Sequence, residues 1–127
     1  MFNKSTYLLI TILLSVIVIS CNSSNKSDEN KDKIMVAKGL YSFGPEVKSF
    51  TDCEEGREFW VTDSAKTLEL AYSNLGFEKP YTPVYVELEG YMIKSDTSTI
   101  TGNYDSTMVV TKLLKISKQI PEGPCSQ

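Results

Sequence analysis

The most constraining feature of this sequence is a single change in the period of its apolar residues. Between residues 63 and 77 (DSAKTLELAYSNLGF), apolar side chains recur three and four positions apart: Leu68, Ala71, Tyr72 and Leu75. This spacing predicts one buried face of an amphipathic helix. Asp63 or Ser64 is placed to cap the start of the helix, and Gly76 suits the left-handed residue that follows its last turn.

The segments on both sides of this helix alternate between apolar and polar residues, which is the period of a β-strand. The predicted strands are 34–43, 47–53 and 57–62 before the helix, and 84–93 and 107–117 after it. Three strands, a helix and two strands are the layout of an OB-fold, a mainly β, five-stranded Greek-key barrel with one helix between strands 3 and 4. A small α+β sandwich is the competing arrangement. The polar loop at 94–106 leaves room for a short hairpin.

Alternation also predicts the side chains that share a face of each strand. Phe59 and Val61 lie together in the third strand, and Val84, Val86 and Leu88 lie together in the fourth. In the last strand, strict alternation predicts two sets: Val109, Thr111, Leu113 and Lys115 on one face, and Val110, Lys112, Leu114 and Ile116 on the other.

Residues 1–20 (MFNKSTYLLITILLSVIVIS) predict an export signal. Lys4 precedes an apolar run from Tyr7 to Ile19. The run has the length of a signal-peptide core and is shorter than the roughly 20 residues of a spanning helix. It ends in VISC, which resembles a bacterial lipobox, so Cys21 is predicted to carry the lipid of the mature protein. The alternative is an uncleaved membrane anchor.

Residues 22–33 (NSSNKSDENKDK) contain no apolar residue and are expected to form a disordered tether after the lipidated cysteine. A coil of this length spans about 20 Å, which lets the folded part, residues 34–127, stand clear of the headgroups. Asn22 occupies a position where aspartate favours inner-membrane retention in enterobacterial lipoproteins, so we expect the outer membrane. Asp28 and Glu29 resemble the surface-export tags of some Bacteroidetes lipoproteins, and a merely solvated tether is the alternative. The sequence leaves periplasmic and surface exposure open.

If Cys21 carries lipid, an even pair of cysteines is left, Cys53 and Cys125. In an oxidising compartment such a pair is typical of a structural disulfide. This bond would hold the tail IPEGPCSQ, whose prolines and glycine disfavour a strand or helix, against the body of the domain. Two redox-active thiols are the alternative, although no C-x-x-C spacing supports it.

Charge and composition limit the classes of function. The net charge of −3 argues against a nucleic-acid partner, since the basic surface that dominates such binding is missing. The chain has no histidine, which excludes Ser-His-Asp and Cys-His catalysis and removes the commonest metal ligand. We therefore expect no enzymatic activity, no metal and no cofactor.

Several groups of polar or aromatic side chains are nevertheless candidate sites. An acidic turn could bind a cation or a basic partner, or be a solvated surface: Asp52, Glu54, Glu55 and Glu58. Glu87 and Glu89 share a strand face and could act as catalytic carboxylates in a small hydrolase, although an exposed strand face is the simpler interpretation.

The aromatic and methionine residues offer two further candidates. Contacts of an OB binding face could come from Trp60, Tyr81, Tyr85, Tyr91 and Tyr104, some of which will be core residues. Thioethers that suit Cu(I) are present at Met35, Met92 and Met108, although their irregular spacing is more typical of core fillers.

A series of short motifs runs in order along the folded part. It comprises a G-x-[YF] strand, an F-x-D-C-x-x-G turn, a strand with valine, an L-E-x-x-Y helix, a V-x-V-x-x-x-G strand and a late cysteine. The residues are Gly39, Tyr41, Phe50, Asp52, Cys53, Gly56, Val61, Leu68, Glu69, Tyr72, Val84, Val86, Gly90 and Cys125. This series resembles the C-terminal OB-type domain of NlpE-like outer-membrane lipoproteins.

The resemblance implies an envelope lipoprotein from a family linked to copper tolerance, surface sensing and envelope-stress signalling. The separate N-terminal domain of that family, with its C-x-x-C motif, has no counterpart here, so its redox or copper role is not transferred. We expect a non-enzymatic lipoprotein whose OB-like domain binds another envelope component. The alternative is a lysozyme-inhibitor-type barrel lipoprotein, because DCEEGREFWV resembles the C-x-x-G strand turn of those inhibitors. TGNY at 101–104 distantly resembles their protruding loop, at the wrong spacing.

Overall fold

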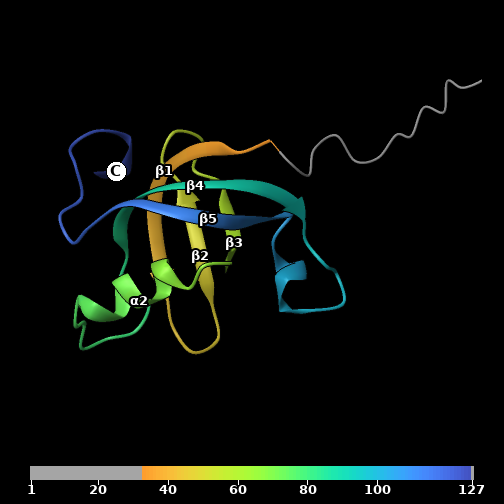
Figure 1. Ribbon diagram of the computed structural model, residues 1–127, viewed down its shortest axis with the longest axis horizontal. Coiled ribbons are helices and arrows are strands. Elements are labelled where there is room, and N and C mark those ends of the chain that lie inside the picture. Colours follow the sequence, from red (N-terminus) through yellow and green to blue (C-terminus); the bar gives the residue numbers. More distant parts are fainter. Residues whose placement is uncertain (1–32, 127) are drawn as a thin grey trace, which may run out of the picture.

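The structure, a computed structural model, describes residues 33–126. Its strands and helix are β1 (Met35–Phe43), β2 (Lys48–Asp52), β3 (Glu58–Asp63), α2 (Thr67–Asn74), β4 (Val84–Lys94) and β5 (Ser106–Ser117), with short 3-10 turns η2 (Ile100–Asn103) and η3 (Pro124–Ser126). The strands close into a barrel in the order β1-β2-β3-β5-β4 (Figure 1). β3 and β5 are parallel and the other neighbours are antiparallel. The predicted five-stranded Greek-key barrel, with its helix between strands 3 and 4, is confirmed.

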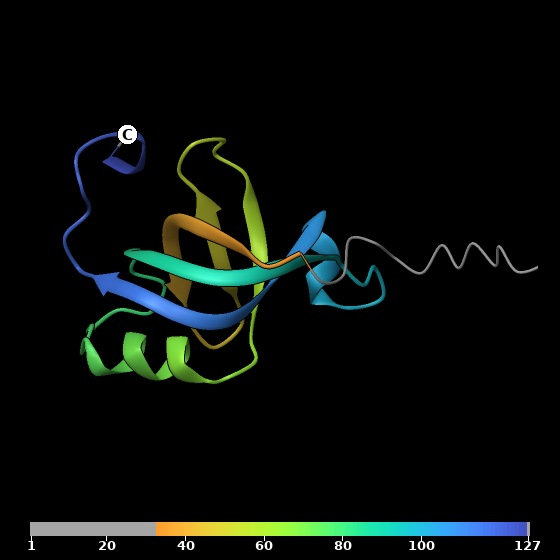
Figure 2. The ribbon, with the colours of Figure 1, turned by 45° about the horizontal axis from the view of Figure 1, so that its top comes forward.

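The core fills the barrel interior as the alternation predicts. Val61, Val84, Val86 and Leu88 are at most 1% exposed, and Phe59 is also buried. The helix α2 lies alongside β5 at one end of the barrel (Figure 2) and buries Leu68 and Tyr72 against this core. The helix is therefore held by tertiary packing, because eight residues alone are too few for a stable helix in water.

The faces predicted for β5 are wrong beyond Val110, because the ladder to β4 contains two irregularities. Gly90 pairs with Val110 and Glu89 with Lys112, so Thr111 is an extra residue; Leu88 pairs with Leu113 and Glu87 with Lys115, so Leu114 is another. Each bulge changes the phase of the alternation. As a result Leu113 and Ile116 both pack against the core, while Leu114 is exposed.

The start of α2 differs in detail from the prediction. Its N-cap residue is Lys66, in a left-handed conformation and without a side-chain cap. Asp63, three residues before Lys66, nevertheless provides an acceptor for a backbone N–H of the first turn: its Oδ2 accepts a hydrogen bond from the Glu69 N–H at 2.9 Å. Gly76 has the predicted left-handed conformation, with φ of 67°.

The loop between β4 and β5 does not form a hairpin. Its backbone turns through η2, held by Gly102 N–H to the Thr99 carbonyl and Tyr104 N–H to the Thr101 carbonyl, both at 3.0 Å. The serine and threonine side chains of the loop also form hydrogen bonds to nearby backbone groups, as Thr99 and Thr101 do to the Asp96 carbonyl. Such local hydrogen bonds compete with the backbone pairing of a hairpin. In the described part of the chain, no helix is long and apolar enough to cross a membrane.

Candidate functional site

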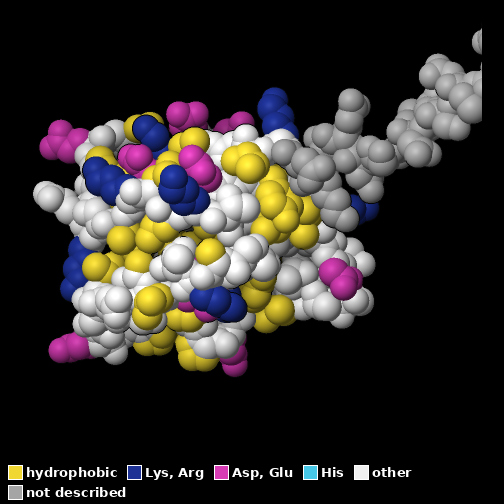
Figure 3. All heavy atoms as spheres, in the orientation of Figure 1, with side chains coloured by type: hydrophobic (Ala, Val, Ile, Leu, Met, Phe, Trp, Pro, Cys, Tyr) yellow, Lys and Arg dark blue, Asp and Glu magenta, His cyan; other side chains and the backbone are white. Residues whose placement is uncertain are grey.

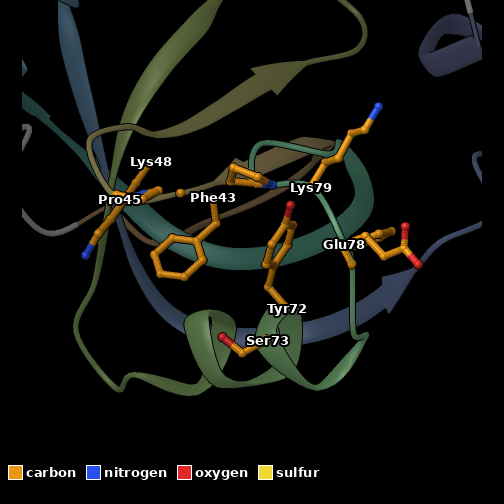
Figure 4. Close-up of a pocket in the computed structure, with 10 residues that line it drawn as sticks. Phe43, Pro45, Lys48, Tyr72, Ser73, Glu78 and Lys79 are labelled. Carbon is orange, nitrogen blue, oxygen red and sulfur yellow. The ribbon is translucent and has the colours of Figure 1, made fainter.

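An open groove lies where the β1–β2 turn meets the C-terminal end of α2 and the loop that follows it (Figure 4). Its volume is about 670 Å³, within the range of ligand pockets. It is lined by aromatic rings, two prolines and a few polar side chains: Phe43, Gly44, Pro45, Lys48, Tyr72, Ser73, Phe77, Glu78, Lys79 and Pro80.

Three aromatic rings pack together along one wall of the groove. Tyr72 is central: it meets Phe43 edge to face, with ring centroids 5.6 Å apart, and lies tilted against Phe77 at 5.3 Å. The Tyr72 hydroxyl donates to the Thr82 carbonyl at 2.7 Å. Burial raises the pKa of the Tyr72 hydroxyl, so this wall is uncharged at neutral pH.

The charges around the groove are mixed in sign and partly neutralised. The Lys48 ammonium contacts the Glu69 carboxylate and lies over the Phe43 ring, 5.6 Å from its centroid. The Lys118 ammonium lies 4.8 Å from the centroid of Phe77. An aromatic wall with lysines and a glutamate at its edge suits an extended segment carrying apolar side chains better than a strongly anionic ligand.

Tyr81 holds the two loops that form this groove. Its N–H donates to the Phe43 carbonyl at 2.9 Å, and its hydroxyl oxygen accepts from the Glu46 N–H at 3.0 Å. Its ring covers Gly44 so closely that a Cβ there would lie 2.3 Å from a ring carbon. The backbone of Tyr81 has φ of 64°, which is strained for a bulky residue and persists only where tertiary contacts impose it.

Two of the five aromatic residues predicted for a binding face are brought together elsewhere. Trp60 on β3 and Tyr104 from the β4–β5 loop have ring centroids 5.8 Å apart. Tyr85 is buried, with its hydroxyl donating to Glu87 Oε1 at 2.9 Å, and Tyr91 is half-buried on β4. The predicted set is therefore divided between separate surfaces rather than one site.

The acidic turn after β2 is a structural feature. Asp52 Oδ1 accepts from the N–H groups of Glu54 and Glu55, at 2.9 and 2.8 Å, and thereby stabilises the turn. Glu55 also pairs with Arg57 at 3.2 Å, while Glu58 starts β3 with its side chain exposed. Within residues 33–126, no group of three His, Cys, Asp or Glu side chains is arranged to hold a metal ion.

Glu87 and Glu89 lie on a strand face of mixed charge, which supports the simpler interpretation of these carboxylates. The register places Glu87 between Lys38 and Lys115, and Glu89 beside Lys112. Figure 3 shows lysine and acidic side chains interspersed on the face of the molecule that carries β4 and β5. Opposite charges on neighbouring strands stabilise a sheet modestly.

The methionines and cysteines are placed as follows. Met108 is buried in the core and pairs in register with Met92, which packs against the same core, whereas Met35 is exposed at the start of β1. Cys53 and Cys125 form the predicted disulfide, with Cα atoms 4.7 Å apart. Cys21, the predicted lipid attachment residue, lies outside the described residues.

Comparison with known proteins agrees with this architecture. A sequence model of the NlpE C-terminal OB domain matches residues 31–123, well over half of the chain. The chain belongs to the NlpE C-terminal OB domain family. No curated protein matches it.

A solved structure extends the likeness at the level of the fold. It is described as the crystal structure of the Cpx pathway activator NlpE from Escherichia coli, and it is similar to this chain with a TM-score of 0.54 and 24% sequence identity. The match covers 75% of this chain and 44% of the other. The chain thus spans less than half the length of that NlpE structure.

Sequence reasoning did not find the groove of this NlpE-type domain. Tyr81 was predicted as an aromatic contact of an OB binding face, whereas in the structure it holds the loops of the groove without lining it. Phe43, Phe77 and Lys48 were not predicted as site residues. One local signal pointed to the region: the segment EKPYTP (78–83), between the helix and β4, has two prolines and marks a loop of restricted conformation. TGNY, which suggested a lysozyme inhibitor, lies in η2 and the residue after it, and the inhibitor alternative stays an untested prediction.

Proposed function

We propose that this protein is a non-enzymatic outer-membrane lipoprotein whose NlpE-type barrel senses the state of the cell envelope by binding another envelope protein. In this proposal residues 1–20 are the export signal, Cys21 is lipidated, residues 22–33 are the tether and residues 34–127 form the binding domain. Membership of the NlpE C-terminal OB domain family supports the envelope location. The description of the similar E. coli protein as a Cpx pathway activator supports a role in stress signalling.

The groove held by Tyr81 is the observation that carries the proposal. Strained backbone conformations persist where the surrounding structure imposes them, and they concentrate at binding sites and ligand clamps. Tyr81 fixes the β1–β2 turn against the loop after α2 with two hydrogen bonds and a ring contact. A groove fixed before its ligand arrives loses less entropy on binding, which favours a specific partner.

The lining of the groove favours a protein partner. An extended peptide with aromatic or proline residues can pack against Phe43, Tyr72 and Phe77, as in other aromatic-lined peptide grooves. Lys79 and Glu78 at the edge can then fix the direction of the peptide through its charges. Among the carboxylates that were candidate sites, Asp52 stabilises a turn, and Glu87 and Glu89 pair in register with lysines of neighbouring strands, which supports binding over catalysis.

Site-specific photocrosslinking in the native envelope tests the groove. A photoreactive residue at Ser73, which lines the groove and is exposed, should give one discrete adduct with an envelope protein. The same residue at Lys112, exposed on the outer face of β5, is the matched control and should not give that adduct. An identical adduct pattern at both positions, or no adduct at Ser73, would contradict the proposed groove.

The anchor is tested separately with Cys21→Ser. The wild type should take up labelled palmitate and sediment with the membranes, since two acyl-chain signals give stable anchoring. Cys21→Ser should lose the label and appear in the soluble fraction or as the uncut precursor. A variant that retains both the label and the processed length would show that Cys21 is not the attachment residue.

A further inference from the structure

A second surface, on the opposite side of the sheet from the core, has an unusual composition. We call it the Trp60 face: the outward side of β3 with its neighbours on β2 and the β4–β5 loop. In register, Trp60 lies between Ser49 of β2 and Thr107 of β5, and Glu58 lies beside Thr51. The accessible side chains of this face are thus an aromatic pair with polar neighbours: Thr51, Glu58, Trp60, Thr62 and Tyr104.

The loop that places Tyr104 on this face is well ordered by its own hydrogen bonds. Asp96 Oδ1 accepts from the Ser98 N–H at 2.9 Å, and the Asp96 carbonyl accepts from the hydroxyls of Thr99 and Thr101 at 3.1 Å. At the base of the loop, the buried hydroxyls of Ser95 and Thr107 are 2.9 Å apart. Tyr104 is therefore held beside Trp60 before any ligand binds.

The charge of this face disfavours one of the two ligand classes that OB-folds commonly bind. OB-folds use this face and the loop between strands 4 and 5 to bind oligonucleotides or oligosaccharides. Residues 95–106 contain two carboxylates, Asp96 and Asp105, and no lysine or arginine. Glu58 adds a further negative charge near the aromatic pair. Burial of the Tyr104 hydroxyl, and secondly the negative charge of Glu58, raise the pKa of Tyr104. A polyanion gains its affinity from cationic side chains, so an oligonucleotide is disfavoured here.

We propose that the Trp60 face binds a neutral glycan chain, one whose sugars carry hydroxyl or acetamido groups and no charge. The C–H faces of sugar rings carry partial positive charge and pack on the electron-rich faces of aromatic rings such as Trp60 and Tyr104. The exposed Glu58 carboxylate, two residues from Trp60 on the same strand face, can accept hydrogen bonds from sugar hydroxyls. This site lies on the outer sheet surface and is independent of the proposed groove.

The single tryptophan of the chain makes the test direct, because its emission reports on Trp60 alone. The full chain, purified in detergent, is titrated with the tetrasaccharide of N-acetylglucosamine and, separately, with cellotetraose. Saturable change in emission with at least one of these neutral glycans is the expected result. Tyr104→Ala should weaken binding about tenfold, since loss of one ring that stacks on a nucleic-acid base weakens binding by a factor of about 5 or more. Tyr104→Phe keeps the ring and should bind as the wild type does.

Tyr91→Ala is the matched control. Tyr91 is another half-buried tyrosine, but it lies on β4, which is separated from β3 by β5 in the barrel. It should leave the affinity unchanged, and circular dichroism should show both alanine variants folded. No change in emission with either glycan would overturn the proposal. So would equal weakening by Tyr91→Ala and Tyr104→Ala, or tighter binding of oligothymidylate than of the glycans. Crosslinking through Ser73 does not depend on any of these outcomes, so failure here is distinguishable from failure of the proposed function.

Discussion

The disulfide between Cys53 and Cys125 joins a nearly independent tail to the barrel, and its removal tests how the tail is held. The hydrogen bonds of residues 118–126 that the structure shows are local, as between Gly123 and Ser126. The Lys118 side chain also contacts the Phe77 ring. We therefore expect Cys53→Ser combined with Cys125→Ser to release the tail after Ser117 and to leave the barrel closed.

The expected loss of stability follows from two loop closures. The bond spans 72 residues of sequence, and closing such a loop in the unfolded chain costs about 4.4 kcal/mol. In the folded protein without the bond, the free tail from the end of β5 at Ser117 to Cys125 is a loop of about eight residues, whose closure costs about 2.5 kcal/mol. The bond stabilises the fold by the difference, so the double variant should lose about 2 kcal/mol.

Urea unfolding followed by Trp60 fluorescence measures this loss. The midpoint should fall by about 1–2 M, and the dependence of the unfolding free energy on urea concentration should rise, because the unfolded chain without the bond is less compact and exposes more surface. Wild-type protein in reductant should match the double variant. A loss near the full cost of closing the unfolded loop would show that the tail is ordered without the bond. A loss below about 1 kcal/mol would refute the loop-closure account itself.

Two further predictions concern the barrel interior. Gly39→Ala should lower the free energy of unfolding by about 1–3 kcal/mol in the same assay, because its Cβ would lie 2.2 Å from the Thr51 carbonyl oxygen, and a stability equal to the wild type would refute this contact. Burial, followed by the nearby carboxylates of Glu69 and Asp63, raises the pKa of Tyr41 far above its ordinary value of 10.0. Because the folded protein holds this proton more tightly than the unfolded chain does, the contribution of Tyr41 to the free energy of unfolding is fully present below pH 10 and decreases above it. Tyr41→Phe should flatten that decrease in unfolding experiments between pH 8 and about pH 11, and should be neutral or stabilising at pH 7 because the Tyr41 hydroxyl has no hydrogen-bond partner among the described residues. An unchanged pH dependence would refute the assignment.

The parts of the fold that depend on local pattern were predictable from the sequence, and the parts that depend on pairing were not. Alternation identified Val84, Val86 and Leu88 as core residues because burial of one face alone produces that pattern. It failed at Thr111 and Leu114, since alternation assumes a regular ladder and each bulge adds an unpaired residue.

The candidate groove could not be predicted because its residues come from three separate elements. Phe43 ends β1, Tyr72 is in α2, and Tyr81 lies in the loop before β4. The positive φ of Tyr81 is imposed by tertiary contacts against its own preference, so no local signal encodes it. The Trp60–Tyr104 pair is a partial success: both residues were candidates, but only the closed barrel shows that they meet while Tyr85 and Tyr91 do not.

The direction of β1 relates the proposed anchor to the two proposed binding surfaces. β1 begins at Met35, beside the β4–β5 loop at one end of the barrel, and ends at Phe43 in the wall of the groove (Figures 1 and 2). At about 3.3 Å per residue, the path along the curved strand between these ends is about 26 Å. In the proposed arrangement, with lipid at Cys21, the groove lies at the end of β1 opposite to the one that the tether joins, where an envelope protein can approach it. The Trp60 face lies on the flank of the barrel, so a bound glycan would leave the groove open, and the two ligands should bind simultaneously rather than compete.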